Sequence, residues 1–170
     1  MKIADQPEFK SKPRPLTCGP ETTLREAAQM MAKANYGSIV IVSPDDKVLG
    51  LLTERDYLNR VVAGSIDPDG TKVGDLMTAE VRVAKASDDL LEWLRIMSNE
   101  RFRRLPVVDE EGKLVNLVTQ GDFVSYTWPD LINQAKTFVQ STAGSNSQLL
   151  LIGGGVLFYS LLLVFLLKAV

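Results

Sequence analysis

The sequence lacks several of the residue types on which catalytic and metal sites depend. It contains no His and one Cys in 170 residues, which excludes His-based acid–base catalysis, zinc sites built from several His or Cys ligands, and a disulfide within the chain. It also lacks a surplus of positive charge, because 19 Lys and Arg stand against 21 Asp and Glu. Binding to a nucleic-acid backbone usually requires such a surplus, so nucleic acid is not an expected partner.

Charge is absent from one long segment near the C-terminus. Residues 149–167, LLLIGGGVLFYSLLLVFLL, contain no charged side chain, and a helix of this length extends about 28 Å at roughly 1.5 Å per residue. That length matches the hydrocarbon core of a bilayer. The alternative is a buried core helix, but a helix that is apolar on every face needs protein on all sides, and the residues before it are too few to surround it. The pattern predicts a single transmembrane helix.

The flanks of this segment predict a topology. Three residues follow it, and the N-terminus has no apolar stretch typical of a signal peptide. We therefore expect a C-terminal tail anchor, with the soluble part on the cytoplasmic side of a membrane or on the equivalent matrix or stromal side. Residues 127–148 are expected to form a connector, in which a Trp-Pro-Asp sequence can begin a short helix.

The remainder of the sequence contains an internal repeat. Residues 22–57 align with residues 88–123 at a constant offset of 66 and without a gap. Each copy reads as an amphipathic helix, a β-branched strand, a turn, a second strand and a Thr-x-x-Asp sequence that opens another apolar helix. Thr22 and Asp88 are the expected N-caps or first-turn residues of the first helix of each copy. Two such units predict one α+β body with pseudo-twofold symmetry.

The order and spacing of these sequences resemble the cystathionine beta-synthase (CBS) domain pair, also called a Bateman module. The resemblance rests on GSIVIV at 37–42, GLLTERD at 50–56, VGDLMT at 73–78 and RRLPVVD at 103–109, followed by Thr119 and Asp122. It covers about residues 16–126. It implies tandem CBS domains at 16–72 and 73–126, preceded by an N-terminal extension at 1–15.

The resemblance also implies where ligands bind. Members of the family often bind adenosine-containing ligands such as AMP, ADP, ATP, NAD or S-adenosylmethionine, and their Thr-x-x-Asp sequence faces the nucleotide. This carries over to Thr53 and Asp56 for one site and to Thr119 and Asp122 for the other. A carboxylate can accept hydrogen bonds from both ribose hydroxyls, and a Thr hydroxyl can donate to a ribose or phosphate oxygen. Helix capping by the two Thr residues is the alternative, and it is compatible with binding.

Arg103 and Arg104 match positions where adenylate-sensing members carry basic residues that contact phosphate. The planar guanidinium suits this role because it offers paired donors to phosphate oxygens; a solvated pair at a strand edge is the alternative. The first copy has Gly37 and Ser38 at these positions. We therefore expect phosphate binding only at the second site, the one that contains Thr119.

Three further assignments follow from the alignment. Thr17 and Val83 fall in the extended segments before each first helix, where family members line the adenine pocket with backbone groups. Arg55 is a candidate phosphate contact or a partner in a surface ion pair. Asn116 replaces the Gly found at position 50, where a small residue lets a ligand approach the backbone, which counts against adenine binding at the second site.

Two functions are consistent with this organisation. The first is a membrane-anchored regulatory module that binds an adenine nucleotide of the AMP, ADP or ATP type and modulates an associated membrane protein or complex. The alternative is a non-sensing accessory subunit of a larger membrane complex, with vestigial pockets. CBS pairs commonly dimerise, so a homodimer is expected. No catalytic residue, metal or required cofactor is expected, because Asp56 and Asp122 have no nucleophile or base beside them in the pattern.

Overall fold

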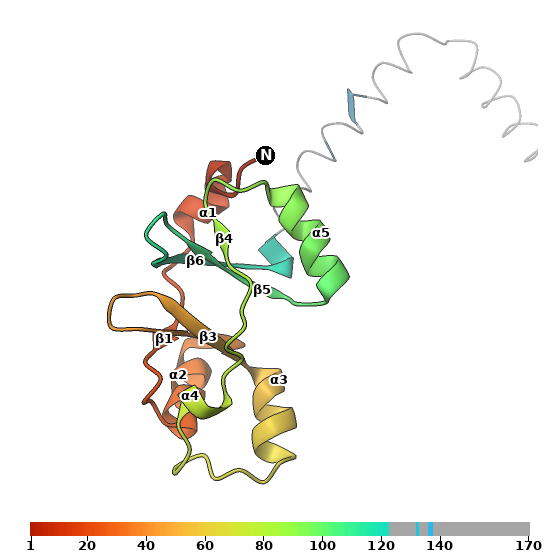
Figure 1. Ribbon diagram of the computed structural model, residues 1–170. Helices are drawn as coiled ribbons and strands as arrows, with labels where there is room; N and C mark the ends of the chain where they lie inside the picture. The colour runs from red at the N-terminus through yellow and green to blue at the C-terminus, as the bar shows by residue number, and fades with distance from the viewer. Residues whose placement is uncertain (123–131, 133–135, 138–170) are drawn as a thin grey trace, which may run out of the picture. The chain divides into compact units, whose positions relative to one another are not determined.

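The computed structural model describes residues 1–122, 132 and 136–137 (Figure 1). The chain divides into two compact units, Met1–Val124 and Ser125–Val170. The predicted transmembrane segment at 149–167 and nearly all of the predicted connector lie outside the described residues. Within the described part of the chain, no helix combines the length and the apolar character needed to cross a membrane.

The two repeats have the same fold, which confirms the predicted α+β architecture. In the first repeat the elements are β1 (Thr17–Cys18), α2 (Leu24–Ala34), β2 (Ser38–Val42), β3 (Val48–Thr53), α3 (Glu54–Asp56), the π-helix η2 (Tyr57–Val62) and α4 (Val73–Leu76). In the second they are β4 (Ala84–Lys85), α5 (Leu90–Glu100), β5 (Arg104–Val108) and β6 (Leu114–Thr119). Two short helices, η1 (Ile3–Asp5) and α1 (Pro7–Ser11), precede both repeats.

Each repeat forms its own three-stranded sheet. The strand orders are β1-β2-β3 and β4-β5-β6. The first two strands of each sheet are parallel, and the second and third are antiparallel. The registers are equivalent, since Ser38 pairs with Thr53 in one sheet and Arg104 pairs with Thr119 in the other. The offset of 66 residues is therefore preserved in three dimensions across these strands.

The two long helices begin one residue later than predicted. Thr23 caps α2 by accepting the N–H of Glu26 (3.2 Å), and Asp89 caps α5 by accepting the N–H of Glu92 (3.0 Å). Thr22 and Asp88 lie outside the helices because their carbonyl groups are engaged elsewhere. These carbonyls accept the N–H groups of Val73 (2.8 Å) and Ile3 (3.1 Å), respectively.

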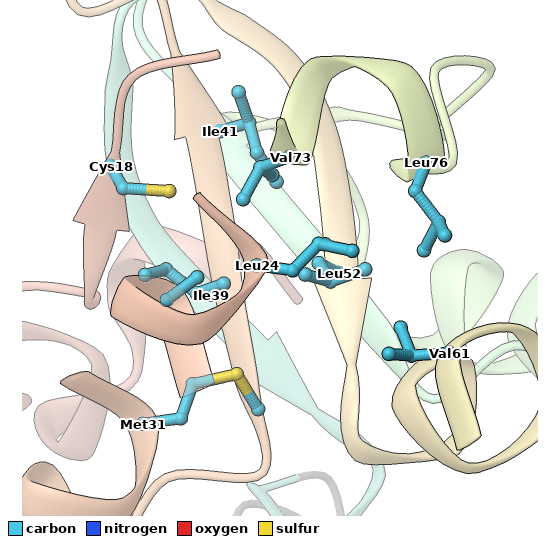
Figure 2. Close-up of a cluster of buried hydrophobic side chains, with 10 residues drawn as sticks. Cys18, Leu24, Met31, Ile39, Ile41, Leu52, Val61, Val73 and Leu76 are labelled. Carbon is cyan, nitrogen blue, oxygen red and sulfur yellow. The ribbon is translucent and has the colours of Figure 1, made fainter. Parts of the chain in front are cut away.

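The apolar face of α2 packs on one face of the first sheet. Leu24 and Met31 of α2 meet Ile39 and Leu52 of the sheet, and Val73 of α4 adds to the same cluster (Figure 2). The other face of this sheet is also covered. Val40, Val42 and Leu51 form a second buried cluster with Leu114 and Leu117 of β6, so the two sheets pack against each other. Strand β2 is buried along its whole length for this reason, which explains the apolar run IVIV that follows Ser38.

The N-terminal segment completes the second repeat in the way that α4 completes the first. Two N–H groups of the N-terminal segment donate to carbonyls before α5, and two N–H groups of α4 donate to the equivalent carbonyls before α2. The four bonds are Ile3 to Asp88 (3.1 Å), Ala4 to Ala86 (2.9 Å), Val73 to Thr22 (2.8 Å) and Gly74 to Pro20 (2.9 Å). Residues 1–15 are therefore an integral part of the folded unit. The sequence did not predict this docking, because these residues lie outside the aligned repeats.

This packing yields a stability prediction for Ile3, whose side chain is fully buried. We expect Ile3→Ala to lower the free energy of unfolding by about 2–5 kcal/mol, because it removes buried methyl and methylene groups and leaves a cavity. Val115→Ala, at an exposed position of β6, is the control, with an expected loss of no more than about 1 kcal/mol. Chemical denaturation measures both, and equal effects would contradict the docking of this segment.

Candidate functional site

Each Thr-x-x-Asp sequence lies where the second antiparallel strand of its repeat ends. In the first repeat, the N–H and the hydroxyl of Thr53 both donate to Oδ2 of Asp56, at 2.9 and 2.7 Å. The N–H of Asp56 donates back to Thr53 Oγ1 at 3.3 Å. The predicted helix cap is thus confirmed for Thr53. The other carboxylate oxygen, Oδ1, faces Arg60 at 3.5 Å and keeps further acceptor capacity.

A cleft of about 440 Å³ opens beside Thr53 and Asp56, and we call it the first cleft. It takes its lining from three parts of the chain: the first repeat, the segment that links the repeats, and the second repeat. The lining residues are Gly37, Leu51, Thr53, Glu54, Arg55, Asp56, Thr78, Glu80, Val81, Arg82, Glu100, Arg101, Phe102, Arg103 and Arg104. Arg55, a predicted phosphate contact or ion-pair partner, lies in this lining, and its role stays a prediction.

The first cleft groups the predicted site residues differently from the sequence prediction. Arg103 and Arg104 line it together with Thr53 and Asp56, the Thr-x-x-Asp of the other repeat. The reason is the packing of the two sheets about the pseudo-twofold axis. This packing brings equivalent positions together, and Arg104 Nε donates to the hydroxyl of Ser38, its own counterpart in the repeat, at 3.0 Å.

The first cleft is rich in charge of both signs, with a small excess of Arg over Asp and Glu in its lining. Arg82 is held by Glu100 through two hydrogen bonds of 3.0 and 3.1 Å. Arg103 is exposed and makes no ion pair among the described residues. Its guanidinium donors are therefore available to an anion in the cleft.

A smaller cavity, about 130 Å³, is the pseudo-symmetric counterpart, and we call it the second cleft. Lys12, Ser38 and Thr119 line it at the positions that Thr78, Arg104 and Thr53 occupy in the first cleft, 66 residues away in each case. Arg104 borders both clefts.

The second Thr-x-x-Asp is engaged by the N-terminal segment. The ammonium group of Lys12 forms an ion pair with the carboxylate of Asp122 and donates to the carbonyl of Leu117 at 2.8 Å. The N–H and hydroxyl of Thr119 donate to Asp122 Oδ2 at 2.6 and 2.7 Å. Burial raises the pKa of Asp122, but the hydrogen bonds from Lys12 and Thr119 outweigh burial and hold this pKa below its ordinary value.

Gly50 and Asn116 are equivalent positions of the two repeats, but a different segment of the chain packs over each. Met77 and Thr78 lie over Gly50, and Phe9 contacts Asn116. A Cβ atom on Gly50 would lie 2.5 Å from Met77 Sδ and 2.9 Å from the carbonyl oxygen of Thr78, so the linking segment itself requires glycine. Asn116 is buried, and its amide donates to the carbonyl of Phe9 at 3.0 Å. Both positions thus make contacts within the chain, and their effect on adenine binding stays a prediction.

Thr17 and Val83 do not line either cleft. Thr17 lies in β1 and pairs with Val40, whereas Val83 is exposed and precedes β4. The chain leaves the clefts as it enters these short strands. The lining comes from slightly earlier residues, namely Leu16 in the second cleft and Val81 and Arg82 in the first.

Sequence reasoning missed several lining residues, among them Lys12, Glu80 and Glu100. The alignment at offset 66 began at residue 22, after the segments that contain Lys12 and Thr78. Extending the same offset towards the N-terminus would have paired these two positions. No group of three or more Cys, Asp or Glu side chains within the described residues is arranged to hold a metal ion.

Comparisons with known proteins agree with this fold. The model of the CBS domain family matches residues 9–63 and 73–128. Hypoxic response protein 1 of Mycobacterium tuberculosis is 33% identical over 112 residues, which is 65% of this chain and 78% of that protein. The mitochondrial CBS domain-containing protein CBSX3 of Arabidopsis thaliana is 32% identical over 113 residues, which is 64% of this chain and 54% of that protein.

A solved structure shares the fold at greater coverage. A CBS domain protein of Pyrobaculum aerophilum, complexed with AMP, superimposes with a TM-score of 0.65 at 22% identity and covers 80% of this chain and 99% of that chain. The chain spans about half the length of some of the curated relatives it matches.

The lowered pKa of Asp122 predicts a pH dependence of stability. A carboxyl group whose pKa is lower in the folded state stabilises the fold above its ordinary pKa, and this contribution is lost as the pH falls through the folded value. We expect the free energy of unfolding to fall more steeply between about pH 5 and pH 3 in the wild type than in Asp122→Asn. Asp45→Asn, at an exposed turn, is the control and should retain the wild-type slope. Parallel curves for wild type and Asp122→Asn would show that the Lys12–Asp122 pair is unimportant in solution.

Proposed function

The chain belongs to the CBS domain family, and on this premise we propose that its first cleft binds an adenine nucleotide of the AMP, ADP or ATP type and so regulates an associated membrane protein or complex. The observation that carries the proposal is the meeting of Asp56 and Arg103 in one cleft of about 440 Å³. This volume lies within the range of small-molecule sites, roughly 300–1,000 Å³. Proteins made of CBS domains alone are typically regulatory and not enzymes, and the proposed role involves no catalysis.

The ribose is proposed to bind at Asp56. Thr53 fixes this carboxylate through Oδ2, and Oδ1, which faces Arg60 at 3.5 Å, keeps lone pairs that can accept the ribose hydroxyls. Holding a carboxylate in place before the ligand arrives reduces the ordering that binding requires. The helix cap and ribose recognition are thus two uses of the same pair of side chains.

The phosphate is proposed to bind at Arg103, with Arg55 and Arg101 nearby in the lining. These guanidinium groups provide donors in the paired geometry that phosphate oxygens accept. Leu51, Val81 and Phe102 contribute apolar surface to the cleft, which supports stacking or packing of a purine. The AMP complex of the Pyrobaculum aerophilum protein is consistent with this assignment, since that protein shares the fold.

The membrane part of the proposal comes from residues 149–167. Their length and lack of charge support a single-pass C-terminal anchor, with the folded unit on the cytoplasmic, matrix or stromal side. A partner in the membrane would then receive the signal. We propose that the unit acts as a homodimer, because Leu58 and Val62 of η2 leave apolar side chains 63% and 67% exposed.

A second candidate function is an accessory subunit that does not sense nucleotides. The observation that favours it is the engagement of Asp122 by Lys12, because one of the two family sites is then already occupied by the chain itself. The two candidates differ in whether the first cleft binds a ligand.

Thermal unfolding with AMP tests the sensing function. At a concentration 100 times its Kd, a ligand adds about 2.7 kcal/mol to the free energy of unfolding, which raises the Tm by about 5 °C or more for a chain of this size. We expect AMP to raise the wild-type Tm and Asp56→Ala to abolish the shift. Asp122→Ala, the equivalent change in the other repeat, should retain it. No shift with AMP, ADP or ATP in a folded wild type would favour the accessory subunit.

The same measurement with adenosine separates ribose recognition from phosphate recognition. Arg103→Met should weaken AMP binding by about tenfold or more, which corresponds to about 1.4 kcal/mol, and leave adenosine binding unchanged. Arg95→Met, an exposed position of α5 outside the cleft lining, is the matched control. Equal losses for AMP and adenosine would remove Arg103 from the phosphate site.

Membrane anchoring is tested by fractionation. We expect the full chain to remain in the membrane fraction after alkaline carbonate extraction, whereas a chain ending at residue 148 should be released. The shortened chain must show the same thermal unfolding transition as the full chain, so that release is not a result of misfolding. Extraction of the full chain by carbonate would contradict the proposed anchor.

A further inference from the structure

We propose that Lys12 is a built-in occupant of the second cleft, which it keeps closed to nucleotides until its side chain is withdrawn. This inference rests on the proposed function, because it assumes that a Thr-x-x-Asp carboxylate is the ribose-binding group. The N-terminal segment, through Lys12, would then control whether the second cleft can bind a nucleotide. The chain would then bind one nucleotide, in the first cleft, while Lys12 stays in place.

Lys12 occupies the position in the second repeat that Thr78 occupies in the first. In the first repeat, Thr78 crosses β3 and forms two backbone hydrogen bonds with Leu51, at 2.9 and 3.0 Å. In the second repeat, the carbonyl of Leu117, equivalent to that of Leu51, instead accepts the ammonium group of Lys12 at 2.8 Å. A long cationic side chain thus replaces a backbone contact, and its charge reaches the carboxylate of Asp122.

The ion pair between Lys12 and Asp122 opposes ligand binding in the second cleft. A ribose diol would have to displace an ammonium group from Asp122, and a charge-assisted pair is stronger than a hydrogen bond between neutral groups. The remaining space, about 130 Å³, is also below the roughly 300 Å³ at which small-molecule sites begin. The first cleft is larger, about 440 Å³, and has the short neutral side chain of Thr78 at the position of Lys12. The cation beside Asp56 is Arg60, which faces Oδ1 at 3.5 Å.

Neighbouring contacts hold Lys12 in position from both sides. Before it, the buried Phe9 offers its carbonyl to the amide of Asn116 at 3.0 Å. After it, Arg14 pairs with Asp46 at 3.1 Å. The buried Phe9–Asn116 contact holds this part of the segment, while the exposed Arg14–Asp46 pair contributes little. Removing the Lys12 side chain alone can therefore open the cleft while the segment stays docked.

The opened cleft would have its own ligand preference. Gly37 and Ser38 stand where the first cleft has Arg103 and Arg104. Without Lys12, the cations in the lining are Arg14, which pairs with Asp46 at 3.1 Å, and Arg104, which borders both clefts. The second cleft should therefore recognise the nucleoside part of a ligand and discriminate weakly between AMP and adenosine. The first cleft, with Arg103, should prefer AMP.

Calorimetric titration of the full-length chain in a mild detergent tests the inference, with AMP and adenosine as probes. We expect one AMP site per chain in the wild type and two in Lys12→Met, with the new site binding AMP and adenosine within about threefold of each other. Lys10→Met, an exposed position of α1 on the same segment, is the matched control and should keep one site. Lys12→Met combined with Asp56→Ala should retain the new site alone.

Each other result is informative. Two AMP sites in the wild type, or one site in both the wild type and Lys12→Met, would overturn the inference and leave the proposed function standing. Absence of AMP binding in every variant would overturn the proposed function and the inference together. If Lys12→Met does not fold, Lys12→Gln takes its place. The Gln amide can still donate to the Leu117 carbonyl, but it places no positive charge beside Asp122.

Discussion

The packing of the two sheets against each other is the constraint on which the candidate site depends. Val40 and Leu51 of the first sheet and Leu117 of the second share one buried cluster, which fixes the two repeats about a pseudo-twofold axis. Arg104 and Ser38, equivalent positions of the two repeats, meet there through a hydrogen bond. Each Thr-x-x-Asp therefore lies near the beginning of the middle strand, β2 or β5, of the other repeat. Both clefts are thus lined by residues of both repeats. A change that separated the sheets would disassemble both clefts at once.

Symmetry in the backbone coexists with inequality in the side chains. The strand registers of the two repeats are the same, yet Thr78 and Lys12 give the equivalent carboxylates opposite surroundings. Asp56 faces Arg60 of its own helical segment at 3.5 Å, whereas Asp122 pairs with Lys12, which comes from the distant N-terminal segment. A duplicated fold can in this way carry one site for a ligand and one site that is satisfied internally, without any change in its strands or helices.

The sequence predicted the repeated elements because their signals are local. Apolar periodicity, the Thr-x-x-Asp caps and the constant offset all lie within short windows, and the structure reproduces them. Arg103 lines the same cleft as Thr53 and not the cleft of Thr119. This placement depends on which faces of the two sheets meet, and no local sequence pattern encodes it. The shift from Thr22 to Thr23 and from Asp88 to Asp89 has the same origin, because contacts with distant N–H groups decide where each helix begins. Lys12 was missed because it precedes the aligned copies.

The docking of the N-terminal segment on the second repeat has a consequence for the order of folding. The N–H of Ile3 donates to the carbonyl of Asp88, and the carbonyl of Phe9 accepts the amide of Asn116, so both residues must wait for partners made more than 80 residues later. Contacts of such long sequence separation slow folding and make it cooperative. Neither repeat is a self-sufficient folding unit, since the segment before each one completes the other. During synthesis the apolar side chains of Ile3 and Phe9, which are buried in the folded unit, therefore stay exposed until nearly the whole module has been made.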